Sequence, residues 1–411
     1  MLLICPTLWA QSAFLALETD LGAPKINLLA AIDIALSKNE HLLQSAQDIS
    51  AQIGLAKQAR SKLLPTIEGS AYVSRDPTES MGSQLGLRVP LIDVSAMFNI
   101  KSASISVNAI KATYERRRDA LVFDVALAYI DALLQQRLLK LAQEQHASSE
   151  IRFASAKRKA ALGEISKLDL KRAELVCART TAQIVKSKAG VKTSAGQLAY
   201  LLGENLQITL DDLPKLSEFD QQDRVILNDI AKTSREDLKA QSLAVQSALF
   251  AQRSALWMFM PTLDAKASLS KALEKDHQWQ SRIDLTIPFY DGGFRYGLLQ
   301  SARAYTLSQK YKKQLLEREI LLEVEGALNE VQKQKELFEV ELQLVAIGEA
   351  SFKSAENRYA LGQATSLDVL DEQTRLFEAQ NNLEKVGVSL YAARLRLAYI
   401  LGDPRKALAN G

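Results

Sequence analysis

The sequence predicts a mostly α-helical chain with four β-strands, built from two tandem copies of one unit: helix, β-hairpin, long helix, turn and helix. Three observations predict this mixed fold class. The segment LAYLLG at residues 198–203 returns as LAYILG at 397–402, an offset of 199 residues. Two tracts of more than one hundred residues contain no proline, a residue that breaks helix interiors. Before each tract, short stretches alternate apolar and polar residues, as strands with one apolar face do.

The repeat divides the chain into a first copy at 28–203 and a second copy at 229–402, with an inter-repeat linker at 204–228 and a short tail at 403–411. Solenoid repeats are only about 20–50 residues long, so each copy is predicted to be a whole structural half. Whatever one copy builds, the other is therefore expected to build as well.

The first 12 residues are apolar and too short to span a bilayer. They end in Ala10-Gln11-Ser12, which has the small-x-small form of a signal-peptidase site, so residues 1–12 are predicted to be a signal peptide. They contain no lysine or arginine, which is consistent with a start further upstream. Lipidation of Cys5 is an alternative that Ile4 disfavours, because a small residue is needed before a lipoprotein cysteine. We therefore expect an exported protein.

Each copy is predicted to contain two long helices that meet at a glycine, Gly163 in the first copy and Gly362 in the second. The helix before each turn would have about 65 residues and a length of roughly 100 Å. Apolar residues at alternating steps of three and four, such as Leu321, Val324 and Leu328, predict coiled-coil packing along these helices.

Four strands are predicted, at about 66–75 and 84–92 in the first copy and at about 262–271 and 280–290 in the second, joined by polar turns at 75–83 and 273–278. Strands of about ten residues can cross a bilayer with tilt, although a soluble sheet would alternate in the same way. In lipid every strand edge must be paired, and bacterial barrels have at least eight strands, so one chain is too few. We expect a barrel shared between subunits, with eight strands from two chains or twelve from three.

Three aromatic residues lie near the predicted ends of the second hairpin, namely Phe259, Phe289 and Tyr290. These positions suit a membrane-interface girdle in contact with outer-membrane lipid, and core packing is the alternative for each residue.

The composition argues against several function classes. The net charge is +3, with lysine and arginine interspersed among acidic residues, so no nucleic-acid partner is expected. The chain has two cysteines, and its three histidines lack the spacing of metal ligands, so no metal site is expected. No nucleophile–base pair or phosphate-binding loop is visible, so we expect neither an enzyme nor a cofactor.

Three motifs of the second copy resemble those of the TolC-type outer-membrane efflux proteins: PFYDGG at 288–293, RYALG at 358–362 and DVLD at 368–371. The resemblance extends over residues from about 28 to 402, although the first copy has PLIDVS at 90–95 in place of the glycine pair. It implies a homotrimer in the cell outer membrane, with a shared twelve-stranded β-barrel and a long coiled-coil tunnel of helices in the periplasm. It also implies passive export, by efflux or type I secretion, with a periplasmic adaptor (membrane fusion) protein and an inner-membrane transporter as partners.

The resemblance further implies roles for individual residues. The two turns would lie at the periplasmic tip and contact the adaptor through Leu162, Gly163, Glu164, Leu361, Gly362 and Gln363. Asp368 and Asp371 would line a periplasmic constriction, where a ring of carboxylates from three chains favours cations. The alternative for Asp368 is helix capping, since residues 365–368 have the form of a capping box.

Tyr359 matches a family tyrosine that helps to hold the tip shut through hydrogen bonds between helices. The arginine that some family members place five residues later is Ala364 here, so the closed state of this chain is expected to be held differently. A competing hypothesis is a periplasmic coiled-coil structural or scaffolding protein that does not enter the membrane. The strand alternation and the aromatic residues favour the channel over the scaffold.

Overall fold

The computed structural model describes residues 25–76, 78–204, 209–214, 216, 223–272 and 277–409. The predicted signal peptide and part of the predicted linker lie outside these residues. The chain forms two compact units, which we call the turn unit and the sheet unit. The turn unit comprises the chain up to Lys38, Asp124–Lys215 and Leu337–Ser389, and the sheet unit comprises Asn39–Phe123, Leu216–Glu336 and the chain from Leu390 onward.

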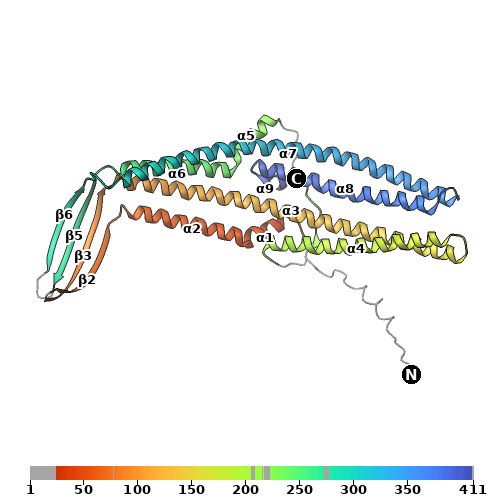
Figure 1. The fold of residues 1–411 in the computed structure, drawn as a ribbon, viewed down its shortest axis with the longest axis horizontal. Coiled ribbons are helices and arrows are strands. Elements are labelled where there is room, and N and C mark those ends of the chain that lie inside the picture. The colour runs from red at the N-terminus through yellow and green to blue at the C-terminus, as the bar shows by residue number, and fades with distance from the viewer. Residues whose placement is uncertain are drawn as a thin grey trace, which may run out of the picture. The chain divides into compact units, whose positions relative to one another are not determined.

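The described residues form the same succession of seven elements twice, as the predicted fold class requires, and a further short helix, α9, follows the second succession (Figure 1). The first copy contains β1 (Lys25–Ile26), α1 (Leu28–Lys38), α2 (Glu40–Ser61), β2 (Thr66–Asp76), β3 (Thr78–Ile92), α3 (Val94–Ala161) and α4 (Lys167–Leu202). The elements that follow are β4 (Thr209–Leu210), α5 (Arg224–Ser234), α6 (Glu236–Trp257), β5 (Thr262–Ala272), β6 (Gln278–Thr286), α7 (Phe294–Ala360), α8 (Ser366–Ile400) and α9 (Pro404–Ala409). β4 and the start of α5 lie in the predicted linker, and α9 lies in the predicted tail.

A glycine with left-handed backbone closes each turn between two long helices, a conformation that a residue without a Cβ adopts at little cost. Gly163 has a φ of 76° and Gly362 a φ of 72°. The residue after each glycine donates its N–H to a carbonyl five residues earlier. The N–H of Glu164 donates to the carbonyl of Lys159 at 2.9 Å, and the N–H of Gln363 donates to that of Arg358 at 2.8 Å. This Schellman geometry satisfies carbonyl groups that the helix end would otherwise leave unpaired.

In the turn unit, the fully buried Tyr129 of α3 holds the small parallel sheet that β1 and β4 form. Its hydroxyl lies 2.9 Å from the carbonyl oxygen of Ile26 and 2.8 Å from that of Asp211, so its hydrogen is donated to this pair. Burial raises the pKa of Tyr129 to about 12, although the hydrogen bond to the Asp211 backbone acts in the opposite direction. The hydroxyl therefore remains a donor at neutral pH.

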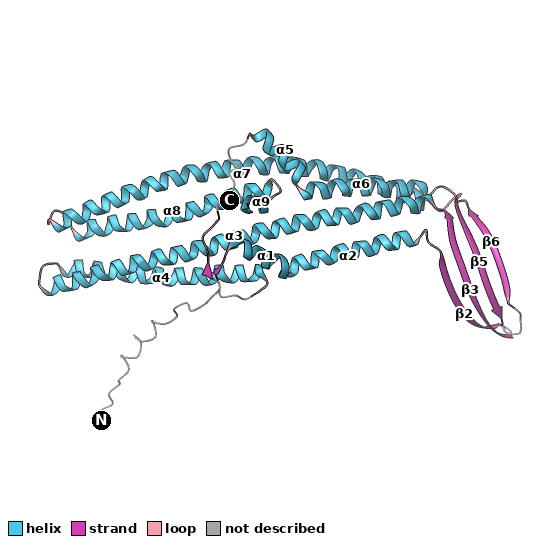
Figure 2. Cartoon of the chain, turned by 180° about the vertical axis from the view of Figure 1, so that it is seen from behind, coloured by secondary structure: helices cyan, strands magenta, loops and turns pink. Residues whose placement is uncertain are grey.

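In the sheet unit, β2, β3, β5 and β6 form one antiparallel sheet in that order (Figures 1 and 2). The register pairs Ile67 with Leu87 and Leu87 with Ala267, which places these apolar residues on one face. One residue further along β3, Arg88 pairs in register with Lys266, and both belong to the polar face. The alternation in the sequence therefore corresponds to a sheet with one apolar and one polar face.

Two strand boundaries differ from the prediction. β3 begins at Thr78 rather than near residue 84, and its pairing with β2 starts with Asp76 opposite Thr78. The segment at 75–83, expected to be a turn because it is polar, is largely strand, since ladder hydrogen bonds are made by the backbone whatever the side chains are. β6 ends at Thr286 rather than near residue 290, because Pro288 has no N–H to donate to a ladder.

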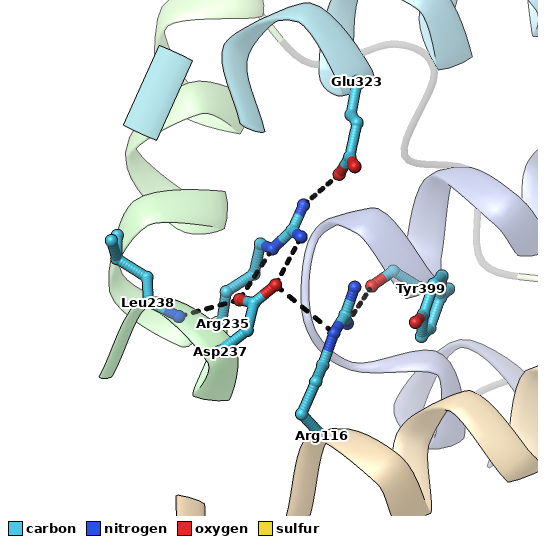
Figure 3. A network of polar contacts seen from close by, with 6 residues as sticks. All are labelled: Arg116, Arg235, Asp237, Leu238, Glu323 and Tyr399. Carbon is cyan, nitrogen blue, oxygen red and sulfur yellow. Dashed lines mark hydrogen bonds and ion pairs between the residues drawn. The ribbon is translucent and has the colours of Figure 1, made fainter. Parts of the chain in front are cut away.

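An ion-pair network in the sheet unit joins the start of α6 to α3, α7 and α8 (Figure 3). Arg235, whose side chain is 3% exposed, donates to both carboxylate oxygens of Asp237, at 3.0 and 2.6 Å, and to Glu323. Arg116 lies 3.6 Å from Asp237, and its guanidinium group covers the ring of Tyr399 at 4.0 Å. Burial alone would raise the pKa of Asp237, but the hydrogen bonds from Arg235 hold it below its ordinary value.

A buried apolar cluster in the sheet unit is shared by α5, α6, α7 and α8 and includes Leu227, Val324, Val331 and Leu397. Val324 belongs to the predicted coiled-coil pattern, and burying an aliphatic side chain of this kind contributes about 1.5–3 kcal/mol. Among the helices that the structure describes, none has an apolar stretch long enough to span a membrane.

Candidate functional site at the helical turns

The two turns of the turn unit present the residues that the sequence predicts for partner contact. Leu162 is 74% exposed and Leu361 is 72% exposed, although both are large and apolar. A Cβ built on Gly163 or Gly362 would meet no atom within 4 Å, so the turns are open on that side. The remaining two predicted contact residues, Glu164 and Gln363, are also exposed.

Each helix after a turn begins with a hydroxyl and a carboxylate that cap one another. The hydroxyl of Ser166 accepts the N–H of Asp169 at 3.1 Å and donates to its carboxylate at 2.7 Å. At the second turn, the carboxylate of Asp368 accepts the N–H of Thr365 at 2.7 Å and its hydroxyl at 2.8 Å. Asp368 therefore fills the capping role that the sequence offers as an alternative, and the bond from the Thr365 backbone holds its pKa below its ordinary value.

Polar contacts within the turn unit link the α3–α4 hairpin to the α7–α8 hairpin. The hydroxyl of Ser366 donates to the carboxylate of Asp169 at 2.8 Å. Arg152 donates to Gln373 at 2.6 Å and to Glu356 at 2.8 Å. The hydrogen bonds from Ser166 and Ser366 lower the pKa of Asp169, which therefore remains an acceptor at neutral pH.

Sequence reasoning missed these links. Arg152 belongs to no motif, and the capping-box pattern at 365–368, which includes Ser366, predicts contacts only within its own helix end. The one signal in the sequence for these links was Asp169, because it occupies in the first copy the position that Asp368 occupies in the second.

Tyr359 and Asp371 lie in different surroundings within the turn unit. Tyr359 lines a cavity of about 120 Å³ between the two hairpins, and the amine of Lys159 lies 5.2 Å from the centre of its ring. No hydrogen bond to the Tyr359 hydroxyl is found among the described residues, so its contact here is of the cation–π type. Asp371 is exposed, and its carboxylate has no ion-pair partner in the part of the chain that the structure describes.

The aromatic residues predicted for a membrane interface belong to the sheet unit. Phe289 is 92% exposed and Tyr290 is 88% exposed, and both directly follow the end of β6. Phe259, which precedes β5, is 43% exposed. Phe289 and Tyr290 are therefore almost fully exposed in the single chain, whereas Phe259 is partly covered.

The described ranges contain no group of three or more histidine, cysteine, aspartate or glutamate side chains arranged to hold a metal ion. Cys177 is the free cysteine within these ranges. The side chains described at the site are carboxylates, hydroxyls, the cationic groups of Arg152 and Lys159, and exposed apolar groups.

Comparison with known proteins finds a match to the family described as "Outer membrane efflux protein", over residues 31–204 and 227–403. Nodulation protein T of Rhizobium leguminosarum bv. trifolii is 26% identical over 382 residues, covering 87% of this chain and 81% of that protein. Outer membrane protein TolC of Escherichia coli (strain K12) is 22% identical over 414 residues, covering 92% of this chain and 82% of that protein.

The fold is also similar to that of CusC, whose solved structures concern conformational changes accompanying folding and transmembrane channel formation. The TM-score is 0.83 at 18% sequence identity, and the match covers 94% of this chain and 96% of that chain. The family and the fold are those of channel proteins rather than of enzymes. Since the family model matches both copies, the chain belongs to the outer membrane efflux protein family: it is an outer-membrane channel protein of the TolC type, with its helices in the periplasm.

Proposed function

We propose that three copies of this chain close one twelve-stranded β-barrel in the outer membrane and form a passive duct for efflux or secretion. The observation that carries the proposal is the sheet itself. Its outer strands, β2 and β6, each pair on one side only, and no other described strand covers their free edges. In lipid an unpaired edge leaves polar groups without partners, so the sheet must be completed by other strands.

The face of the sheet supports contact with lipid. Ile67 is 71% exposed, Ile283 is 69% exposed and Leu285 is 61% exposed, and all three belong to the apolar face. Eight strands would leave an interior filled by side chains, whereas twelve leave room for a pore. Three chains therefore fit a duct, and Phe259, Phe289 and Tyr290 would lie at the lipid headgroups.

We further propose that the two turns of each chain dock on a periplasmic adaptor, which connects the channel to an inner-membrane transporter. Leu162 and Leu361 support this role, because two exposed leucines at the tips of long helices are a ready contact surface for a partner. The chain shows no motif for nucleotide binding or catalysis, so the energy for export would come from the transporter.

The constriction is proposed to lie at Asp371 and Asp368, with Tyr359 close by. Three-fold symmetry would bring several carboxylates together around one narrow entrance, which favours cations. The links from Ser366 to Asp169 and from Arg152 to Gln373 would hold the hairpins of each chain together while the entrance is closed.

The test combines native mass measurement with conductance. The full chain, extracted from outer membranes in detergent, should have the mass of three copies and should form conducting pores in planar bilayers. Asp371→Asn should weaken block by a trivalent cation added on the periplasmic side, whereas Glu174→Gln, which removes another exposed carboxylate, should leave it unchanged. Release of the protein by osmotic shock without detergent, or pores that never form, would refute the duct and favour the scaffold.

A further inference from the structure

The two copies within one chain meet along a set of contacts that we call the intrachain seam. In the sheet unit, the ring of Phe123 on α3 stacks on the ring of Tyr399 on α8 at 4.7 Å, with an angle of 9° between the rings. Arg116 of α3 covers the same ring and donates to the Tyr399 carbonyl at 3.2 Å. In the turn unit, the seam ends with the hydrogen bond from Ser366 to Asp169.

The offset of 199 residues is preserved in the backbone as well as in the sequence. α4 begins at Lys167 and α8 at Ser366, and glycines of positive φ occur at 163 and 362 and again at 203 and 402. Every residue of the intrachain seam therefore has a counterpart in the other copy. In a closed ring of alternating copies, these counterparts must meet between chains, because the second copy of one chain is followed by the first copy of the next.

The counterparts of Phe123, Arg116 and Tyr399 in the other copy are exposed, and two of the three are leucines. Phe123 corresponds to Leu322, which is 71% exposed, and Arg116 corresponds to Leu315, which is 57% exposed. Tyr399 corresponds to Tyr200, which is 68% exposed and borders a surface groove of about 660 Å³ between α3 and α4. Tyr200 and this groove thus correspond to the Tyr399 side of the intrachain contact, and the two leucines correspond to the side formed by Phe123 and Arg116.

The counterparts at the tip have opposite charges. Asp169 corresponds to Asp368, and Ser366, which donates to Asp169, corresponds to Lys167. Both Lys167 and Asp368 are exposed. A lysine therefore occupies the donor position and a carboxylate the acceptor position.

We propose that neighbouring copies of this chain join along an interchain seam in which Tyr200 packs against Leu315 and Leu322 of the next copy, and Lys167 forms an ion pair with Asp368 of the next copy. This proposal rests on the trimer proposed above and specifies the surface that builds it. Asp368 would then serve both the seam and the entrance, whereas Asp371 would serve the entrance alone.

The two seams differ in chemistry. In the intrachain seam the guanidinium group of Arg116 covers the ring of Tyr399. At the corresponding place of the interchain seam, Leu315 would meet Tyr200 and the contact would be apolar. The intrachain ion pair of Arg137 with Glu384 corresponds to Glu336 and Val185, which cannot form one. The apolar contact at Tyr200 and the ion pair at the tip therefore carry the interchain seam.

Cross-linking with a short bis-maleimide tests the upper contact. The full chain, with Cys5→Ser and Cys177→Ser as background, would carry Tyr200→Cys and Leu322→Cys and be treated in intact outer membranes. We expect covalent dimers and trimers on a denaturing gel. The matched control, Phe123→Cys with Tyr399→Cys, should cross-link within one chain, so that both thiols are consumed while the protein migrates as a monomer.

The outcomes separate this proposal from the proposed function. A native mass of three chains together with only monomers from the Tyr200–Leu322 pair would overturn the seam and leave the duct intact. A native mass of one chain would overturn both.

The ion pair is tested by dissociation of the trimer in detergent. Lys167→Ala should speed dissociation at low salt by about two- to fivefold for each pair lost, the effect of a partly exposed ion pair, and the difference should shrink at high salt. Lys171→Ala is the matched control, because Lys171 lies on the same helix and pairs with Glu174 of its own chain. Equal rates for the two variants at low salt would remove Lys167 from the seam.

Discussion

Replacing Arg235 with methionine should destabilise the sheet unit by about 3 kcal/mol, the lower end of the cost of breaking a buried ion pair. Arg235 is 3% exposed and donates three hydrogen bonds to two carboxylates. After its removal Glu323, which is 46% exposed, is hydrated again. Asp237, which is 24% exposed, keeps Arg116 at 3.6 Å and the N–H of Leu238 at 2.8 Å, so its charge is only partly compensated.

The different burial of these side chains also predicts an order of stability losses among variants. Asp237→Leu should cost more, about 4 kcal/mol, because it leaves the more deeply buried guanidinium group with Glu323 alone. Glu323→Gln should cost only about 0.5 kcal/mol, since that partner is well exposed. Arg235→Met combined with Asp237→Leu should cost clearly less than the sum of the two single changes, because neither charge is then left buried without its partner.

Urea unfolding of the detergent-extracted full chain, followed by far-ultraviolet circular dichroism, provides the four free energies of unfolding for this cycle. The expected coupling between Arg235 and Asp237 is about 2–3 kcal/mol. Strictly additive costs would show that the two side chains do not act as a pair, and would refute the role of their ion pair in stabilising the sheet unit.

Two further predictions concern stability. Burial raises the pKa of Asp119 from 3.8 to about 6, against the attraction of Arg116 and Arg118. The folded pKa exceeds the unfolded one, so the contribution of Asp119 to stability is fully present below about pH 4 and is lost as the pH rises through 6. Because the carboxyl group is only partly buried, Asp119→Asn should add about 1–2 kcal/mol at pH 7.5 and almost nothing at pH 4, and a gain independent of pH would contradict this. In thermal unfolding, Gly402→Ala should be more harmful than Gly362→Ala, which should cost about 1 kcal/mol. Both glycines have positive φ, but only at 402 would a Cβ lie 3.0 Å from the backbone of Ser234, so equal losses would mean that this clash is relieved.

The fold could be predicted closely from the sequence where a periodic pattern or a special backbone residue determines the structure. Gly163 and Gly362 identify the two turns because few other residues adopt a left-handed backbone. Strand boundaries were less accurate. The polar stretch before residue 84 pairs in the ladder as well as an apolar one would, and Pro288 ends the last strand earlier than the alternation of its neighbours indicates.

The candidate site could be predicted only in part. The exposed leucines and glycines of the turns follow from local sequence, and so does the cap that Thr365 and Asp368 form. The link from Arg152 to Gln373 joins residues more than two hundred positions apart. Such a contact depends on how two hairpins are aligned along one another, and no short-range pattern in a single sequence encodes that alignment.

The open sheet has a consequence for the way this protein reaches its final state. Between export and insertion, each chain would present the outer edges of β2 and β6, which no other described strand covers, together with an exposed apolar face. The same features by which three chains would close the proposed ring also allow indefinite edge-to-edge addition. Closure of the ring therefore competes with aggregation. A closed ring stops growing at three chains, whereas an open edge can accept a further chain after every addition. Low copy number and holding chaperones that cover strand edges would favour the productive route.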